Sequence, residues 1–375
     1  MAIALSQVEP VPRLRAELPN KTRIFVERTS AINTVTVELY AANLSSIETK
    51  DQHGFRHLVE HLACRGKDRL LDRKLESKGL YLTASTTRDG MAIQITGPSE
   101  HVGLAMDAVM EVATSFECTP EQIAKEVTIL KEELAIISPA HLTAVTAWET
   151  FFGDQGLDAY GNPEVMATAT PEQLKEVHRR QFLPAGLALV VIGDIAVDPV
   201  MTRAKSLLES RGGDEPSGSA RFGDDTPSRV MSKSPGEARA VLVQGFPEVS
   251  TMSALAAALV FQSEIDGLQT IYTVSGRAGV VSLTCPDAGI LGGIDELTLP
   301  QRTALVARAR QLAAIYMRSQ IQDRARYAHL RAVLLRDHPG LTPEDLLNQA
   351  NGLTTEQILN GMRMFNRDEC VRVSG

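Results

Sequence analysis

Three residues in one short stretch have the types and spacing of a metal site. His57, Glu60 and His61 follow one another in the order H-x-x-E-H within residues 54–64. On a helix with 100° per residue they share one face, and two imidazoles one turn apart can bind one metal ion. A carboxylate beside them can accept a proton from water that the metal activates. The spacing therefore predicts a metal site with a general base next to it.

The motif is short, so a simpler alternative has to be kept: a surface helix with two solvated histidines. The opposite face of the same predicted helix is apolar, with a stripe at i, i+3, i+4, i+7 and i+8 formed by Phe55, Leu58, Val59, Leu62 and Ala63. We expect this stripe to pack on a core. Gly66 is expected to end the helix.

A hydrolytic zinc site needs a third protein ligand and one open position. A predicted helix that begins at Pro120 offers Glu126, Glu132 and Glu133. On the helical wheel Glu126 and Glu133 lie at the edge of the apolar stripe, whereas Glu132 faces solvent. We predict Glu133 as the third ligand and Glu126 as a partner that orients a ligating histidine. The alternative is that both are ordinary surface carboxylates.

The elements that must position these residues alternate between strands and helices. Apolar alternation and β-branched residues predict strands at 22–27, 34–40, 80–87, 91–97, 187–192, 238–245, 271–274 and 280–285. Helical periodicity predicts helices at 69–78, 101–116, from 120, and at 142–152, 171–182, 199–209, 252–262, 300–336 and 343–364.

Two segments are alike, which suggests an internal repeat. T-P-E-Q-L at 170–174 and T-T-E-Q-I at 354–358 each begin a predicted helix that leads into a strand ending in glycine. Two similarly built halves explain this, and coincidence at a common type of helix start is the alternative. Residues 212–228 are dominated by Gly, Asp, Pro and Ser and are expected to be an exposed linker.

Composition excludes several classes of protein. The net charge of −8 argues against a general nucleic-acid binder. No apolar run reaches the length of a membrane span, and the N-terminus has no secretory pattern. The four cysteines form no C-x-x-C, so we expect no disulfide framework and a cytoplasmic location. Cys64 falls on the metal-facing side of its helix, but a small hydrophobic role is favoured over ligation.

These features together resemble the pitrilysin or insulinase metallopeptidases, a family that includes the mitochondrial processing peptidase. The resemblance rests on the inverted H-x-x-E-H motif and its continuation to Gly66, and on the strand at 82–86 followed by Arg88-Asp89. It also rests on the glutamate pair, on Tyr160-Gly161-x-Pro163, and on the strand that ends at 191–194.

The resemblance implies an α+β fold of two tandem, structurally related α/β half-domains of the processing-peptidase type, the second one shortened. Residues 1–211 would be the zinc-binding catalytic domain, 212–228 the linker and 229–375 a related non-catalytic domain. One Zn²⁺ per chain would be bound by His57, His61 and Glu133, with Glu60 as the general base that activates water.

The resemblance also implies how substrate binds. An extended peptide would add to an edge strand through Leu82, Thr83, Ala84 and Ser85, with Tyr272 contributed by the second half. Many relatives have Asn where this chain has Thr83. Active relatives have an Arg seven residues before the Tyr, where this chain has Ile265.

The predicted function is a zinc-dependent endopeptidase that cleaves peptides or small unfolded chains, such as precursors of peptide cofactors or natural products. The chain would be the catalytic subunit of a heterodimer whose homologous partner supplies the Arg/Tyr pair, with a homodimer as the alternative. The second hypothesis is a non-catalytic, peptide-binding or structural subunit. A third, metal storage or regulation, would require a closed site with four ligands.

Overall fold

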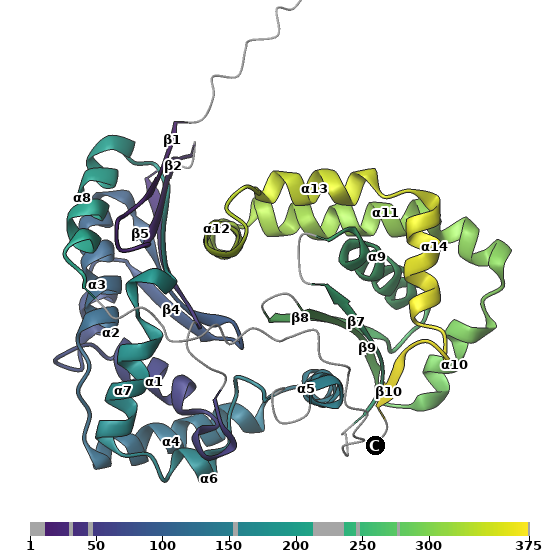
Figure 1. The fold of residues 1–375 in the computed structure, drawn as a ribbon, viewed down its shortest axis with the longest axis horizontal. Helices are drawn as coiled ribbons and strands as arrows, with labels where there is room; N and C mark the ends of the chain where they lie inside the picture. Colours follow the sequence, from purple (N-terminus) through teal and green to yellow (C-terminus); the bar gives the residue numbers. More distant parts are fainter. Residues whose placement is uncertain are drawn as a thin grey trace, which may run out of the picture.

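Two separate β-sheets, one from each half of the chain, are the framework of the molecule (Figure 1). The computed structural model describes residues 12–29, 33–43, 48–152, 157–212, 236–244, 248–275 and 278–373. Apart from Gly212, the predicted linker at 212–228 lies outside the described residues.

The first sheet has six strands in the order β1-β2-β6-β3-β5-β4. They are β1 (Arg13–Glu17), β2 (Arg23–Arg28), β3 (Thr34–Ala42), β4 (Tyr81–Thr86), β5 (Gly90–Pro98) and β6 (Leu187–Gly193). β2 and β6 are parallel, and the other neighbours are antiparallel. Every residue of β6 is buried, as its unbroken apolar run requires of a central strand. β4 lies at the edge.

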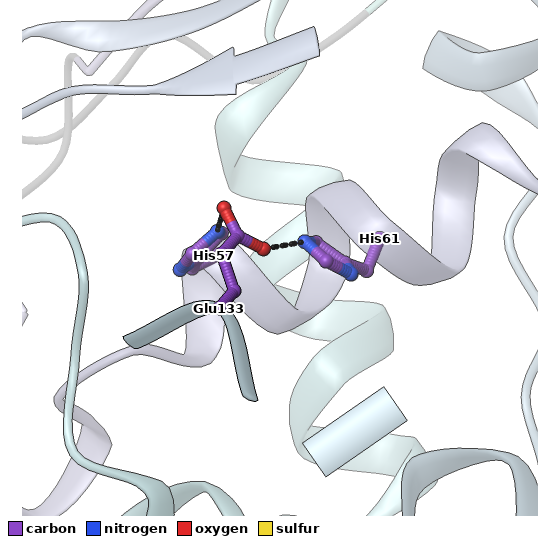
Figure 2. A group of neighbouring side chains, drawn as sticks. All are labelled: His57, His61 and Glu133. Atoms are coloured by element: carbon purple, nitrogen blue, oxygen red, sulfur yellow. Dashed lines mark ion pairs between the residues drawn. The ribbon is translucent and has the colours of Figure 1, made fainter. Parts of the chain in front are cut away.

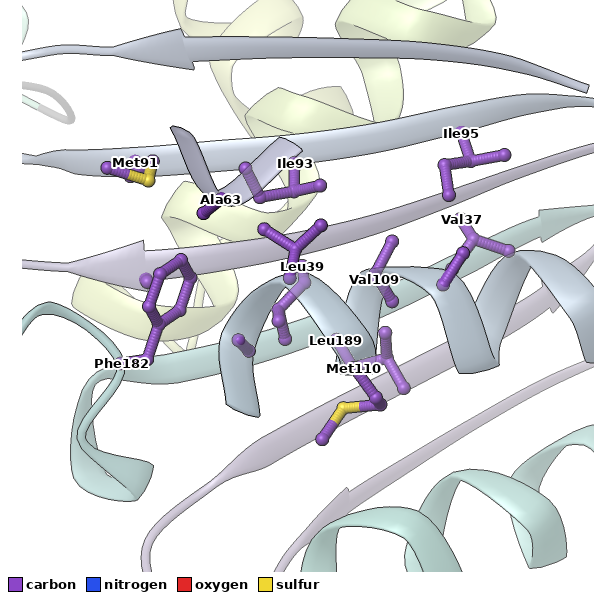
Figure 3. Close-up of a cluster of buried hydrophobic side chains, with 14 of the residues drawn as sticks. Val37, Leu39, Ala63, Met91, Ile93, Ile95, Val109, Met110, Phe182 and Leu189 are labelled. Atoms are coloured by element: carbon purple, nitrogen blue, oxygen red, sulfur yellow. The ribbon is translucent and has the colours of Figure 1, made fainter. Parts of the chain in front are cut away.

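Helices cover one face of this sheet (Figure 1). They include α1 (Phe55–Cys64), α2 (Leu71–Glu76), α3 (Val102–Thr114), α4 (Pro120–Ala135), α6 (Pro163–Met166), α7 (Pro171–Gln181) and α8 (Val197–Glu209). The core between the layers joins strand residues such as Leu39 and Ile93 to Val109 of α3 and Ala63 of α1 (Figure 3). The packing of α1 is therefore set by the sheet beneath it.

The second sheet has the same arrangement as four neighbouring strands of the first, up to the edge strand β4. Its order is β10-β7-β9-β8, formed by β7 (Glu237–Gln244), β8 (Gln269–Ser275), β9 (Ala278–Cys285) and β10 (Val371–Val373). All its pairs are antiparallel, which matches the order and directions of β6-β3-β5-β4. Among the described residues, it has no counterpart of β1 and β2. The predicted fold class, two related α/β halves with a shortened second half, is confirmed.

The helices of the second half are α9 (Val249–Glu264), α10 (Ala288–Glu296), α11 (Leu299–Gln322), α13 (Pro343–Gly352) and α14 (Thr355–Met364). The helical stretch predicted at 343–364 is in fact α13 and α14. The stretch predicted at 300–336 is also two helices, α11 and α12 (Arg324–Asp337). Asp323 separates them, because its side chain accepts a hydrogen bond from the amide of Arg326 and begins a new helix. β1, α6 and α10 were not predicted. None of the helices in the described residues is long and apolar enough to cross a membrane.

The two halves exchange one helix each. α12 (Arg324–Asp337), from the second half, packs on the first sheet, where Ala328 and Ala332 contact Phe25 and Val190. α5 (Pro139–Phe152), from the first half, packs Trp148 on the second sheet. Both helices lie between the two sheets, seen end-on in Figure 1. The division into domains at 1–211 and 229–375 stays a prediction.

Candidate metal centre

α1 carries the H-x-x-E-H motif and is buried on nearly all sides. Gly54, with φ of 97°, precedes the helix, and Gly66, with φ of 71°, follows its end. The five apolar residues of the predicted stripe are all buried in the first core. His57 and Glu60 on the other face are each only 7% exposed. The alternative of two solvated histidines on a surface helix is therefore wrong.

α4 brings the two glutamates to this face of α1. Thr119 begins the helix with a capping box that Gln122 completes. Ile123 and Val127 pack into the core, which leaves the Glu126 side chain buried beside α1. The Glu133 side chain, in contrast, is 49% exposed. Glu133 is the more exposed of the two because the helix ends two residues later and its last turn is open to solvent.

His57, His61 and Glu133 converge on one point (Figure 2). Glu133 Oε1 lies 4.0 Å from Nε2 of His57, and Glu133 Oε2 lies 3.4 Å from Nε2 of His61. One ligand atom from each residue lies within 4.8 Å of the others. Two imidazole nitrogens and one carboxylate oxygen are the donor set of a three-ligand zinc site, so these residues fit the metal.

The other ring nitrogens are held by acceptors. Nδ1 of His57 lies 2.9 Å from the main-chain oxygen of Tyr160. A carbonyl oxygen only accepts, so Nδ1 carries a proton, and Nε2 is the ring atom that faces Glu133. Nδ1 of His61 lies 3.5 Å from Oε2 of Glu126. In both histidines, Nε2 is therefore the ring nitrogen directed at Glu133.

Glu126 lies where a partner that orients His61 has to lie. Burial alone would raise its pKa, but hydrogen bonds from His61 and from Arg65, whose Nε is 3.1 Å away, outweigh burial and lower the pKa to about 2. Glu126 therefore remains ionised and can accept the Nδ1 proton of His61 across the neutral pH range. Arg65, which the sequence analysis did not single out, anchors the far side of this carboxylate.

Glu60 is connected to the edge strand. Its Oε2 accepts a hydrogen bond of 2.7 Å from Oγ1 of Thr86, the last residue of β4. One oxygen of a buried carboxylate is thereby fixed in place. Thr86 was part of the predicted strand but was not predicted as a site residue, since only the packing of β4 against α1 reveals the contact.

The predicted substrate-binding residues lie on β4 and β8. Leu82 and Ala84 pack against the first core, whereas Thr83 and Ser85 are exposed on the other face of the strand. Among the described residues, no strand pairs with the outer edge of β4. Tyr272 of β8 and Thr86 at the end of β4 both line a cavity of about 290 Å³ between the halves.

Cys64 is not among the three converging ligands. Its side chain packs against the first core, and burial raises the pKa of its thiol. A neutral thiol is a poor metal ligand, so the structure is in keeping with the small hydrophobic role expected for Cys64.

The scaffold of two related halves is similar to that of M16-like peptidases. Residues 23–150 match the model of the family described as Insulinase (Peptidase family M16). The matched region contains α1, the edge strand β4 and α4. The resemblance to the insulinase metallopeptidases is therefore confirmed.

Among named proteins, an uncharacterised zinc protease of Streptomyces coelicolor is 23% identical over 206 residues, which is 53% of this chain and 45% of the relative. A probable mitochondrial-processing peptidase subunit beta of Arabidopsis thaliana is 21% identical over 204 residues, 51% of this chain and 38% of the relative. Subunit 1 of the mitochondrial cytochrome b-c1 complex of Bos taurus is 30% identical over 132 residues, 34% of this chain and 27% of that protein. Each match spans less than half of the relative's length.

Solved structures match nearly the whole chain. A protease from Helicobacter pylori superimposes with a TM-score of 0.76 at 15% identity, covering 97% of this chain and all of the other. An M16-like peptidase from Alicyclobacillus acidocaldarius, described as putative in its name, gives a TM-score of 0.73 at 17% identity and covers 99% of each chain. At such identities the likeness shows the fold.

Proposed function

We propose that the chain is a zinc-dependent endopeptidase that cleaves peptides or small unfolded precursor chains. The observation that supports this most is the convergence of Nε2 of His57, Nε2 of His61 and the Glu133 carboxylate on one point, with Glu60 one turn away on the same helix. The relatives named as zinc proteases support it as well.

The roles of the residues follow from their positions. His57, His61 and Glu133 would hold one zinc ion, which when bound supplies a Lewis acid for the scissile carbonyl and for water. Glu60 takes a proton from the attacking water and returns it to the leaving amine. Thr86 donates to Oε2 of Glu60 and fixes the orientation of the carboxylate that does this. The free edge of β4 binds the peptide backbone as an added strand, through Leu82 to Ser85.

The proposed enzyme has two chains. Position 265, seven residues before Tyr272, holds Ile where the resemblance implies an Arg. A homologous subunit would supply the Arg/Tyr pair, and a homodimer is the alternative. One relative is named as a subunit of a processing peptidase, which supports a heterodimer. The cytoplasmic location stays a prediction, and a neighbour of the same fold is described as a periplasmic protease.

A second candidate is a non-catalytic, peptide-binding or structural subunit. The observation that favours it is the similarity to a protein named as a subunit of the cytochrome b-c1 complex. The peptidase proposal differs from it in requiring metal.

The deciding experiment is elemental analysis of the purified chain. We expect about one zinc ion per wild-type chain and a large loss in Glu133→Gln, because the amide is a much weaker ligand than the carboxylate. Glu132→Gln is the matched control, since Glu132 is an exposed neighbour on the same helix. Wild-type protein without zinc, or equal zinc in both variants, would contradict the three-ligand site and favour the non-catalytic subunit.

A further inference from the structure

The segment 157–162 lies against the N-terminal end of α1. Its closest approach is between two glycines: a Cβ on Gly161 would lie 2.3 Å from Cα of Gly54. Both glycines have positive φ, 97° at Gly54 and 88° at Gly161. Only residues without a side chain permit this contact, so the segment is held directly on the helix that carries the metal ligands.

Within this segment, Asp158 fixes the direction of the backbone. Its Oδ1 accepts hydrogen bonds from the amides of Tyr160, at 2.7 Å, and of Gly161, at 2.9 Å. The Gly161 amide and the Tyr160 carbonyl belong to the same peptide group, so the bond to Asp158 also fixes the direction of this carbonyl. That carbonyl is the one that accepts the Nδ1 proton of His57. The orientation of the His57 ring thus depends on a turn that one carboxylate closes.

Asp158 is in turn held by its neighbours. Its Oδ2 lies 3.4 Å from Nε2 of His53, and both side chains are only 13% exposed. The main-chain oxygen of His53 accepts from the amide of Asn162 at 3.1 Å. Arg88 donates from Nε to the carbonyl of Leu157 at 3.1 Å. Because both side chains of the His53–Asp158 pair are shielded from water, their contact is stronger than it would be in solvent.

The Arg88 contact also connects the turn to the second half. The guanidinium of Arg88 lies over the ring of Trp148, 4.7 Å from its centre. Trp148 is fully buried in the cluster that α5 forms with the second sheet.

We infer that Asp158 is a positioning residue for His57: it closes the turn that aims the Tyr160 carbonyl at Nδ1, and so keeps Nε2 of His57 directed at the metal. This inference rests on the proposed function, because it concerns a ligand of the proposed zinc site. The imidazole of His57 has two tautomers, and only the one with its proton on Nδ1 offers Nε2 to a metal.

The tautomer can be measured without metal. In metal-free full-length chain labelled with ¹⁵N-histidine, long-range ¹H–¹⁵N correlation spectra should show His57 with its proton on Nδ1. In Asp158→Ala the two tautomers should mix. Asp158→Asn should keep the wild-type tautomer, because its Oδ1 can still accept both amides. If Asp158→Ala does not fold, Asp158→Leu replaces it, since this side chain is of similar size and has no acceptor for either amide.

Zinc affinity gives the second readout, by competition with a chromophoric chelator. We expect Asp158→Ala to weaken zinc binding about 10- to 100-fold, as for other residues that orient a ligand, with Asp158→Asn closer to wild type. Asp107→Ala on α3 is the control, since this half-exposed carboxylate pairs only with Arg203 in the described residues and should leave affinity unchanged.

An unchanged tautomer and unchanged zinc affinity in Asp158→Ala would overturn the inference. So would an Asp158→Asn variant as weak as Asp158→Ala, because the charge rather than the amide acceptor would then be responsible. Failure of the proposed function looks different: wild-type chain would bind no zinc, while the tautomer experiment would still report whether Asp158 orients His57.

Discussion

Glu60 is the residue on which the chemistry of the proposed site depends. It lies on the same helix face as the two histidines, and Thr86 holds one of its oxygens. Burial to 7% exposure keeps bulk water from competing for this carboxylate. Glu60 is not one of the three converging residues. A substitution at Glu60 therefore tests proton transfer without removing a metal ligand.

The prediction at the residue scale concerns Glu60→Gln. The amide has the same shape and can still accept from Thr86, but it cannot take a proton from water. We expect zinc content to equal that of wild type, while kcat/KM for cleavage of an unfolded peptide falls at least about a hundredfold. Cleavage would be followed by chromatography of the fragments, with Glu132→Gln as control. Full activity in Glu60→Gln would show that another group is the base.

At the scale of elements, α7 packs against α1 and helps to hold it on the first sheet. Arg56 of α1 donates from Nε to Oε1 of Gln181 at 2.8 Å, and Gln181 donates to the carbonyl of Ala41 on β3 at 2.7 Å. His178 also lies on α7. Its Nε2 is 2.8 Å from the carbonyl oxygen of Val112, and its ring contacts those of Phe116 and Phe182. The position of the motif helix is therefore set by a helix that begins more than 100 residues later.

The prediction at this scale is a pH dependence of stability. Burial is the main cause that lowers the pKa of His178 to about 4, well below its ordinary value of 6.5; the bond to Val112 opposes this shift and the charge of Arg211 adds to it. As the pH falls, this histidine binds a proton in the unfolded chain at a higher pH than in the folded chain. The stability that neutral His178 contributes is therefore fully present above pH 6.5. It is lost as the pH falls toward 4. At about 1.4 kcal/mol per unit of pKa, the loss is on the order of 3 kcal/mol.

The measurement is the free energy of unfolding in urea between pH 4 and 7. From pH 7 to pH 4, the free energy of unfolding of His178→Gln should fall by less than that of wild type, the difference being about 3 kcal/mol. His101→Gln, at a partly exposed histidine beside α3, should keep the wild-type slope. Equal slopes in wild type and His178→Gln would mean that folding does not lower the pKa of His178.

At the scale of the whole molecule, the exchange of α5 and α12 ties the two halves together. Polar contacts reinforce the apolar ones: Nδ1 of His329 on α12 lies 2.9 Å from Oε1 of Glu38, a fully buried residue of β3. Gln94 of β5 donates to the carbonyl of Ala325 at 3.0 Å. The cavity beside the proposed metal site is lined by both halves, so its shape depends on this docking.

The prediction at this scale is that the halves unfold together. Ala328→Asp puts an unpaired carboxylate at a fully buried position between α12 and the first sheet, and should cost on the order of 3 kcal/mol. The chain has one tryptophan, Trp148, which reports on the second sheet. Its fluorescence transition in urea should move to lower urea together with the far-ultraviolet circular dichroism transition.

The control for this experiment is Ala307→Asp, at an exposed position of α11, which should shift stability by no more than about 0.5 kcal/mol. Transitions of fluorescence and circular dichroism that separate in Ala328→Asp would contradict a single cooperative unit. They would also make the cavity between the halves a variable feature rather than a fixed one.

The sequence alone predicted the features that depend on local spacing. The motif helix, the helix starts at Thr119, Thr170 and Thr354, and most strands follow from periodicity and capping, which act over a few residues. The repeat was visible because two such local patterns recur. The glutamate pair could be selected because a helical wheel places it relative to α4's own apolar stripe.

Only the tertiary structure decided which distant groups meet. The bonds from Thr86 to Glu60 and from Nδ1 of His57 to the Tyr160 carbonyl join segments far apart in the chain. The second of them uses a main-chain atom, which has no sequence pattern. The exchange of α5 and α12 between the halves could not be predicted from the sequence either. An amphipathic helix shows that it needs an apolar surface, but not which of two sheets provides it.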